Sequence, residues 1–397
     1  MTEWIVRDSL YGNISVDQKV IIDLINTQEF QRLRRILQLG GGQYAFPSAT
    51  HNRFTHSIGV YHLIDKIFKN NAFKILSQQE KILTQIAGLL HDLGHGPFSH
   101  SFEDVTSINH EEWTIKIICD ENTQVHQVLK KHQINIEAIC KIIAKKHPNK
   151  ILLSLVSSQL DCDRMDYLLR DSYYTGVEYG NFDIDWIIQN IKIYQDQIVY
   201  DSKAIFAVEN YLLSRYHMYW QIYNHKIGIS FDHLLLNIFK RLRFLSKTNY
   251  EFMQDIFSIE EIINEKPLSV EKYLELDDYS LMSLFKNLMK EKDFILKDLT
   301  TRIVNRQFFK LISNYQQKDL KNYRKLLVEL KYDLDYYLVI DKFSQPVFYQ
   351  MNDKKQTIKF IDKDLKIFNF EQKSQLVGLE QSNKQQDYIL IPKEVKI

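Results

Sequence analysis

Cysteine, proline and glycine are scarce in this chain of 397 residues, where they occur 3, 6 and 12 times. The cysteines, Cys119, Cys140 and Cys162, are scattered and lack Cys-x-x-Cys spacing, which argues against a disulfide framework and against a zinc ribbon. The shortage of glycine and proline disfavours a β-sandwich with many tight turns and favours long helices.

The chain also lacks an excess of charge and any apolar run of transmembrane length. Lys and Arg number 51 against 50 Asp and Glu, so nothing global argues for a nucleic-acid or membrane partner. The first residues, MTEWIVRDSLYG, show no basic segment followed by an apolar one. Hydrophobic residues make up 45% and charged residues 25%, as in soluble globular proteins. We therefore expect a cytoplasmic protein, with neither membrane nor nucleic acid as its partner.

Hydrophobic periodicity predicts the organisation. Apolar residues recur at helical spacing over 16–39, and helical patterns continue over 110–147, 151–172 and 204–246. From about residue 331 the pattern changes to short β-rich runs at 336–340, 347–349, 357–361 and 388–391. The sequence predicts a mainly α protein, with a helical body over 1–315 and a smaller α+β C-terminal region over 316–397.

The segment HDLGHGPFSH follows an apolar run and packs several imidazoles and a carboxylate into ten residues. The run predicts a buried helix that carries His91 and Asp92 inward. A buried imidazole beside a buried carboxylate is costly unless both are paired or bind a metal. His56, in HNRFTHS, and Asp163, in DCDRMDYLLRD, add two more ligand types. One divalent ion (Mn, Fe, Mg, Zn or Ni) suits such a set, and it would acidify water and polarise a phosphoryl oxygen.

The segment DCDRMDYLLRD predicts a helix with a polar stripe. Asp163, Tyr167, Arg170 and Asp171 fall at i, i+4, i+7 and i+8, with Arg164 beside them. One interpretation is the wall of a phosphate and metal pocket, and the other is a buried salt-bridge stripe between helices. Single residues have plain alternatives too. His56 could be a core histidine, His95 and His100 could cap helices, and His110 could open an exposed helix.

The segments HNRFTHSIG, HDLGHGPFSH and DCDRMDYLLRD, taken together, resemble the HD-domain deoxynucleoside triphosphate triphosphohydrolases. The stretch FQRLRRILQLGGGQYAFPSATHNRFTHS also resembles that family, and the likeness is dense from about residue 6 to 228. The resemblance implies a helical HD core over about 50–175. It also implies metal-dependent hydrolysis of dNTPs to deoxynucleoside and inorganic triphosphate by a homotetramer.

The family's functional residues fall on matching positions of this sequence. Its metal ligands correspond to His56, His91, Asp92 and Asp163. Its catalytic histidine corresponds to His110, with His100 as a candidate proton donor to the leaving oxygen and Glu103, an Asp in the eukaryotic enzyme, orienting the pair. Its phosphate contacts correspond to Arg53, His95, His100, Arg164, Tyr167 and Arg215. Gln38 and Asp171 match contacts to the 3′-hydroxyl, and Leu39 and Tyr223 match residues that crowd the 2′ position.

The resemblance also implies an activating nucleotide, (d)NTP, between subunits. Gln31, Arg32 and Arg34 match one half of that site, and Arg306 and Lys310 match phosphate contacts from a neighbour. The sequence departs from the eukaryotic pattern at Asn26, where that form has a guanine-reading Asp, and at Trp4, where it has Lys. Because an amide pairs less well than a carboxylate with two N–H donors, the activator stays open.

Two other functions stay open on the sequence. The first is a different HD phosphohydrolase, acting on (p)ppGpp, a cyclic nucleotide or a nucleoside monophosphate. The second is a nucleotide-sensing or single-stranded nucleic-acid-binding protein with a vestigial site. Intact ligand types at all four metal positions weigh against the second.

Overall fold

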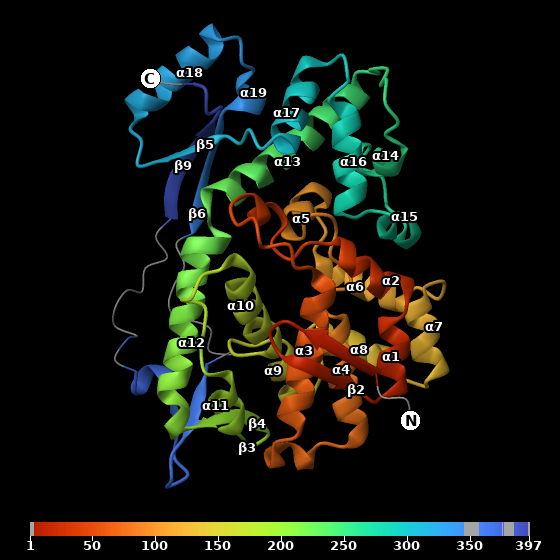
Figure 1. Cartoon of the computed structure of the whole chain (residues 1–397), viewed down its shortest axis with the longest axis vertical. Coiled ribbons are helices and arrows are strands. Elements are labelled where there is room, and N and C mark those ends of the chain that lie inside the picture. Colours follow the sequence, from red (N-terminus) through yellow and green to blue (C-terminus); the bar gives the residue numbers. More distant parts are fainter. Residues whose placement is uncertain (1–3, 345–356, 375, 377–384, 396–397) are drawn as a thin grey trace.

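The computed structural model describes residues 4–344, 357–374, 376 and 385–395. It opens with an antiparallel hairpin of β1 (Trp4–Asp8) and β2 (Gly12–Val16). Ten α-helices follow, and these helices with the loops between them contain the segments that the sequence singled out (Figure 1): α1 (Lys19–Ile25), α2 (Gln28–Arg32), α3 (Arg53–Phe68), α4 (Gln78–Leu90), α5 (His100–Thr106), α6 (His110–Cys119), α7 (Gln124–Lys131), α8 (Ile136–Ile143), α9 (Lys150–Val156) and α10 (Cys162–Thr175).

Side-chain caps explain where these helices start. Ser77 and Glu80 form a capping box at α4, and Asn52 and Asp161 accept backbone N–H groups at α3 and α10. The helix expected over 16–39 is broken, because the Thr27 side chain accepts from the Phe30 N–H and begins α2 as a separate helix. Local capping here overrides a hydrophobic periodicity that runs through the break.

The core of the N-terminal half is built around α3, which packs against α4 and α10. Leu63 and Ile64 of α3 and Leu89 of α4 are fully buried. Burying each such side chain stabilises the fold by about 1.5–3 kcal/mol. A Cβ at Gly88 would lie 2.2 Å from Cδ1 of Ile64, so glycine lets the two helices approach closely. This close pair sets the spacing between the segments that hold His56 and His91.

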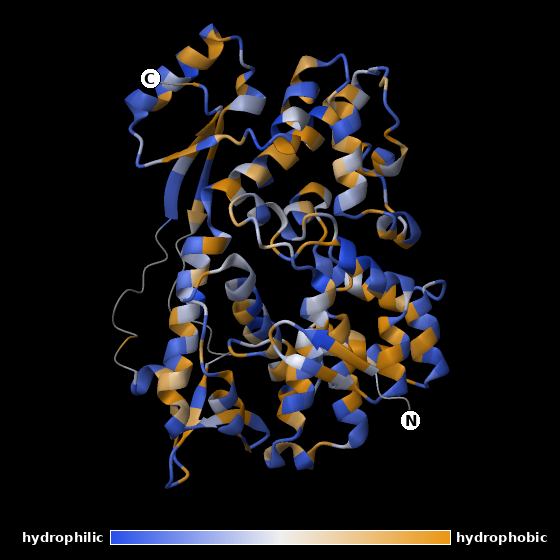
Figure 2. Cartoon of the chain, in the orientation of Figure 1, coloured by the Kyte–Doolittle hydropathy of each residue, from blue (hydrophilic) through white to orange (hydrophobic). Residues whose placement is uncertain are grey.

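The second half extends this body. Its helices and hairpin are α11 (Ile184–Gln189), β3 (Ile191–Tyr194), β4 (Gln197–Asp201), α12 (Ile205–Met218), a π-helical turn (Tyr219–Tyr223), α13 (Lys226–Lys247), α14 (Glu260–Ile263), α15 (Val270–Leu274), α16 (Asp278–Leu288) and α17 (Phe294–Val304). The long helix α13 packs against α5, α14 and α17, and so joins the two halves. Hydrophilic residues interrupt the hydrophobic ones along α12 and α13 (Figure 2). Within the described ranges, no helix is long and apolar enough to cross a membrane.

The C-terminal region contains β5 (Lys310–Ser313), α18 (Gln317–Glu329), α19 (Leu334–Tyr337), β6 (Val339–Ser344), β7 (Lys359–Ile361), β8 (Ile367–Asn369) and β9 (Gln385–Ile391). The prediction of a mainly α fold with a smaller α+β C-terminal region is confirmed. The run at 336–340 divides between α19 and β6, and the run at 347–349 lies outside the described residues.

Two sheets connect the C-terminal region to the helical body. β9 lies between β5 and β6 in an antiparallel sheet, so β5, before the expected boundary at 315, pairs with a strand far beyond it. β7 pairs in parallel with β4, which adds the β7–β8 hairpin to the β3–β4 hairpin. Both sheets of the C-terminal region therefore include a strand that precedes residue 315.

Candidate active site

Three helices bring the four predicted metal ligands together. His56 lies on α3, His91 and Asp92 directly follow α4, and Asp163 lies in the first turn of α10. The His56 Nε2 atom is 3.1 Å from Oδ1 of Asp163 and 3.5 Å from Oδ2 of Asp92. The His91 Nε2 atom is 3.2 Å from Oδ1 of Asp92 and 3.5 Å from Oδ1 of Asp163. The sequence placed His91 and Asp92 inside the helix, whereas α4 ends at Leu90 and His91 caps it.

The donor atoms fit one divalent ion. The Nδ1 atoms of His56 and His91 are 2.8 Å from an Asp166 oxygen and from the Gly88 carbonyl, respectively. These acceptors favour the tautomer that turns each Nε2 lone pair toward the centre, where both Nε2 atoms are buried without a hydrogen-bond partner. Ligands about 2.1 Å from a metal, at tetrahedral or octahedral angles, lie about 3.0–3.4 Å apart. The distances between the donor atoms here, from 3.1 to 3.5 Å, are close to that range.

Negative charge is concentrated around the two imidazoles. Burial lowers the pKa of His56, but the nearby carboxylates of Asp163 and Asp166 outweigh it and raise that pKa to about 10. Burial raises the pKa of Asp92, yet the charges of His91 and Arg53 hold it well below its usual range. A divalent cation compensates such an excess of carboxylate charge.

Arg170 supports this centre from behind. Its guanidinium donates to both oxygens of Asp166, at 2.8 and 3.0 Å, and to Asp8 of β1 at 2.9 Å. Arg170 and Asp166 are fully buried. The pocket-wall interpretation does not hold for Arg170, which is absent from the lining that includes Tyr167 because its guanidinium is bound by Asp166 and Asp8. The salt-bridge interpretation holds for Arg170, and the pocket interpretation holds for Asp163, Arg164, Tyr167 and Asp171.

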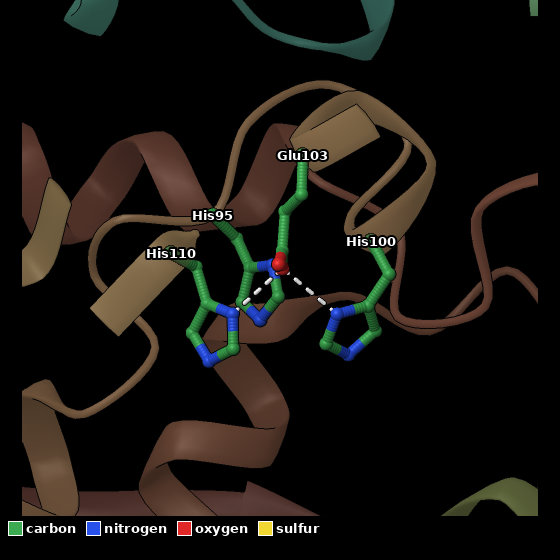
Figure 3. Close-up of side chains that lie close together, drawn as sticks. All are labelled: His95, His100, Glu103 and His110. Atoms are coloured by element: carbon green, nitrogen blue, oxygen red, sulfur yellow. Dashed lines mark hydrogen bonds and ion pairs between the residues drawn. The ribbon is translucent and has the colours of Figure 1, made fainter. Parts of the chain in front are cut away.

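Three histidines surround one carboxylate beside the metal ligands (Figure 3). Oε1 of Glu103 lies 2.8 Å from Nδ1 of His100 and 2.7 Å from Nδ1 of His110. Both imidazoles therefore donate from Nδ1 and keep Nε2 free for a ligand. Burial raises the pKa of Glu103, but these hydrogen bonds lower it to about 2. His95 stacks on His110 with ring centroids 3.9 Å apart.

The loop before α5 is held in a strained conformation. Phe98 and Ser99 have φ values of 60° and 58°, a region that costs free energy for residues other than glycine. Oδ1 of Asp278 accepts the Phe98 N–H at 2.7 Å, and the Ser99 hydroxyl donates to the Leu37 carbonyl at 2.6 Å. These contacts hold the loop that connects His95 to His100.

Replacement of Asp278 by asparagine should reveal a pH-dependent contribution to stability. Burial raises the pKa of Asp278 to about 7, although the Phe98 and Leu37 N–H groups lower it. The carboxyl group of Asp278 therefore loses its proton at a lower pH in the unfolded chain than in the folded chain. Its contribution to the free energy of unfolding is complete below about pH 4 and is lost as pH rises toward 7. We expect the wild-type advantage over the variant to shrink by at least about 1.4 kcal/mol, one pKa unit, between pH 4 and 7. Urea unfolding of both proteins checks this, and parallel pH profiles would contradict it.

A pocket of about 480 Å³ joins these groups. Its lining includes most residues expected to touch substrate: Gln38, Leu39, Arg53, His95, His100, His110, Arg164, Tyr167, Asp171 and Tyr223. Asp92 and Asp163 also line it. Arg215 is buried on α12 and is not part of this lining.

The sequence reasoning missed several residues of this site. His51 lies 2.7 Å from Oδ1 of Asp171, and the Tyr223 hydroxyl donates to Oδ2 of the same carboxylate at 2.8 Å. Lys145 lines the pocket from the end of α8. His51 stands in the segment THNRF, two residues before Arg53, so its place in a motif was a signal. No local pattern distinguishes Lys145 from the lysines around it.

The residues expected at an activator site lie in different environments. Gln31 donates to the Ile25 carbonyl, and Arg34 donates to Gln31 at 2.8 Å, which places both near the exposed Asn26. Lys310 is exposed on β5, and Trp4 is half-buried in β1. The exposed Arg306 donates to the Tyr44 carbonyl at 2.9 Å.

Arg32 differs from these residues because its side chain is fully buried. Its guanidinium donates to the carbonyls of His95 and Leu276, each at 2.9 Å. The expectation that Arg32 contacts an activator is therefore corrected: Arg32 supports the His95 loop from inside the protein.

Comparisons with known proteins agree with this geometry. Residues 53–171 match the HD domain, and residues 182–242 match the HD associated region. Protein YwfO of Bacillus subtilis is 42% identical over 350 residues, which are 86% of this chain and 80% of YwfO. A deoxynucleoside triphosphate triphosphohydrolase SAMHD1 homolog of Dictyostelium discoideum is 35% identical over 255 residues, 59% of this chain and 48% of that protein. This chain therefore matches about half of its length.

A solved structure shares the whole fold. The crystal structure of a phosphohydrolase from Bacteroides thetaiotaomicron matches with a TM-score of 0.89 and 28% identity, over 99% of this chain and 100% of that one. The resemblance seen in the sequence is confirmed: the chain belongs to the HD-domain phosphohydrolase family that includes the deoxynucleoside triphosphate triphosphohydrolases.

Proposed function

We propose that this protein hydrolyses dNTPs to deoxynucleoside and inorganic triphosphate with one divalent metal ion. The observation that carries the proposal is the pocket itself. One cavity joins the metal ligands Asp92 and Asp163, the histidine pair bridged by Glu103, the cations Arg53 and Arg164, and Asp171. Relatives named deoxynucleoside triphosphate triphosphohydrolase support this choice of substrate.

The protein's own groups supply the proton transfers. His56, His91, Asp92 and Asp163 would hold a divalent ion, which would supply Lewis-acid polarisation of a phosphoryl oxygen. His110, whose Nε2 is 3.9 Å from Oδ1 of Asp92, takes the proton of the attacking water. His100 enters as the imidazolium and gives its Nε2 proton to the leaving 5′ oxygen, while Glu103 accepts the Nδ1–H of both His100 and His110.

Cations and aromatic groups bind the rest of the substrate. A triphosphate carries about four negative charges, which need charge-assisted hydrogen bonds. Arg53, Arg164 and Tyr167 line the pocket as donors for these charges. Arg215 is buried behind the lining, so its contact with phosphate requires a rearrangement of the side chains in front of it.

Sugar recognition centres on Asp171 and Gln38. Each Asp171 oxygen accepts one hydrogen bond and keeps a lone pair for the 3′-hydroxyl. Oε1 of Gln38 is buried without a partner, and an unpaired buried acceptor is costly until a ligand donates to it. Leu39 and Tyr223 line the same pocket, and they would exclude a 2′-hydroxyl.

The regulatory part of the proposal is a homotetramer activated by a (d)NTP between subunits. Asn26, Gln31 and Arg34 would form one side of that site, and Arg306 and Lys310 of a neighbour would supply phosphate contacts. Exposure of Asn26, Arg34, Arg306 and Lys310 supports this role.

The test is product analysis with purified, metal-loaded protein. Each dNTP is supplied alone with Mn²⁺ or Mg²⁺, and then with GTP or dGTP added, and products are separated by ion-exchange chromatography. We expect deoxynucleoside and inorganic triphosphate in equal amounts. Release of pyrophosphate or single phosphate would instead indicate another HD phosphohydrolase, and binding of dNTP without any product would indicate a sensor.

The Glu103→Gln substitution should lower kcat while leaving KM nearly unchanged. The amide loses the charge that fixes the tautomers of His100 and His110, although its oxygen still reaches them. Loss of such an orienting carboxylate costs about 10–100-fold. Steady-state kinetics checks the prediction, with Glu112→Gln as the control, since Glu112 is exposed on the first turn of α6. A variant with unchanged kcat would refute the orienting role.

A further inference from the structure

Lys145 stands at the mouth of the pocket, close to the histidine pair. It follows the C-terminal end of α8, which packs against α6. Its Nζ atom donates at 2.7 Å to Oε1 of Glu111, the residue after His110. Both side chains are partly exposed, at 47% for Lys145 and 37% for Glu111. Both residues line the pocket, so this ion pair borders the cavity where the phosphates of a substrate would lie.

The pocket has few cations to offer a polyphosphate. Only three of its lining residues carry a full positive charge, and these are Arg53, Arg164 and Lys145. Its acidic lining residues are more numerous: Asp92, Asp104, Glu111, Asp161, Asp163, Asp171 and Asp232. Even with a divalent ion bound, a ligand with about four negative charges needs every cation that can reach it.

The three cations differ in their freedom to move. Arg53 is 5% exposed and donates to Asp92 at 2.6 Å, so its position is tied to the metal centre. Arg164 donates to the Ser158 carbonyl at 2.8 Å and lies 3.3 Å from Asp161. Lys145 has a flexible stem and three N–H donors, of which Glu111 takes one. It is thus the cation best able to turn toward an incoming phosphate.

We propose that Lys145 determines polyphosphate length by binding the terminal phosphate of the substrate, while Glu111 holds its ammonium group when the pocket is empty. The inference rests on the proposed function for the identity of that substrate. Three of the metal ligands, His56, His91 and Asp92, are buried and Lys145 is exposed, so a phosphate chain that starts at these ligands and runs toward solvent can reach Lys145. A shorter chain would leave Lys145 on Glu111.

The backbone at position 145 allows a clean substitution. Lys145 has a φ of 61°, and the N–H of Lys146 bonds to the Lys141 carbonyl at 2.8 Å. Glycine is the usual residue at such a helix end, because it adopts positive φ without strain. Lys145→Gly therefore removes the ammonium group without straining the fold, and loss of a half-exposed ion pair costs little. The melting temperature of this variant should equal or exceed that of the wild type.

The experiment is calorimetric titration of the metal-loaded protein with inorganic tripolyphosphate, pyrophosphate and phosphate. We expect Lys145→Gly to weaken tripolyphosphate binding about tenfold or more, the size of one charge-assisted hydrogen bond, and to leave phosphate binding unchanged. Lys145→Arg should keep the affinity. Glu111→Gln, which frees the ammonium group, should bind tripolyphosphate more tightly than the wild type.

Equal tripolyphosphate affinity in the wild type and in Lys145→Gly would overturn the proposal. An equal loss for all three ligands would overturn it too, because it would indicate a general charge effect. A lowered melting temperature with unchanged affinity would assign Lys145 a structural role alone. These titrations use no nucleotide, so their result is independent of whether any dNTP yields triphosphate.

Discussion

His91→Ala is expected to lose the bound divalent metal and the hydrolytic activity together. His91 offers a buried Nε2 atom with no other partner, between two carboxylates that need a cation. Alanine removes one of four ligands and leaves those carboxylates less compensated. Because a metal contributes several kcal/mol to stabilising a phosphoryl-transfer transition state, we expect activity to fall by at least about a thousandfold. Metal content by mass spectrometry and product release from the same preparation check both parts.

The matched control is His132→Ala. His132 also pairs with a carboxylate, since its Nε2 lies 2.8 Å from Asp23, but that pair stands outside the pocket lining. This variant should keep its metal and its activity. A His91→Ala protein that retains stoichiometric metal would refute the assignment of His91 as a ligand. Retained activity after complete loss of metal would refute the metal's role in the reaction.

The sequence could predict the ligand cluster because its members stand in compact motifs. His91 and Asp92 follow an apolar run, and such a run is buried in most folds. His56 and Asp163 are far apart along the chain, so their residue types suggested one metal site and the family resemblance supplied their assignment as ligands. The structure shows the physical cause, which is the packing of α3 against both α4 and α10.

Side-chain direction was harder to predict than helix position. Arg170 lies within one turn of Tyr167 on the same helix, yet it faces the buried Asp8 of β1. Its orientation depends on a strand more than 160 residues earlier in the chain. Arg32 is a similar case, because its carbonyl partners come from the His95 loop and from Leu276. Helical spacing alone carries no information about such distant partners.

The pairing partners of the strands also could not be predicted from local sequence patterns. The β-rich runs near 357–361 and 388–391 were recognisable from their composition. Their pairing with β4 and β5 depends on closure of long loops, which composition does not specify. The register in which Tyr388 faces Ser313 follows from that tertiary closure.

Arg170→Met tests whether the buried support behind the metal ligands stabilises both the fold and the metal. The guanidinium compensates two buried carboxylates, Asp8 and Asp166. Removing one partner of a buried ion pair costs about 3–5 kcal/mol. Asp166 also orients His56 through Nδ1, and loss of support for such a contact lowers metal affinity about 10–100-fold. We therefore expect a lower free energy of unfolding without metal and a weaker metal affinity in the folded protein.

A second buried arginine provides the comparison that separates these two effects. Arg302 is 5% exposed and pairs with Asp298 and Glu394, at 2.7 and 2.5 Å, in a different part of the protein. Arg302→Met should lower the free energy of unfolding while leaving metal affinity unchanged, because no metal ligand contacts its partners. Chemical unfolding with a chelator present, and metal titration of the folded proteins, measure the two quantities separately. Equal metal affinities in the two variants would show that Arg170 stabilises only the fold, whereas a loss confined to Arg170→Met would show that the buried Asp8–Arg170–Asp166 chain holds His56 in position to bind the metal.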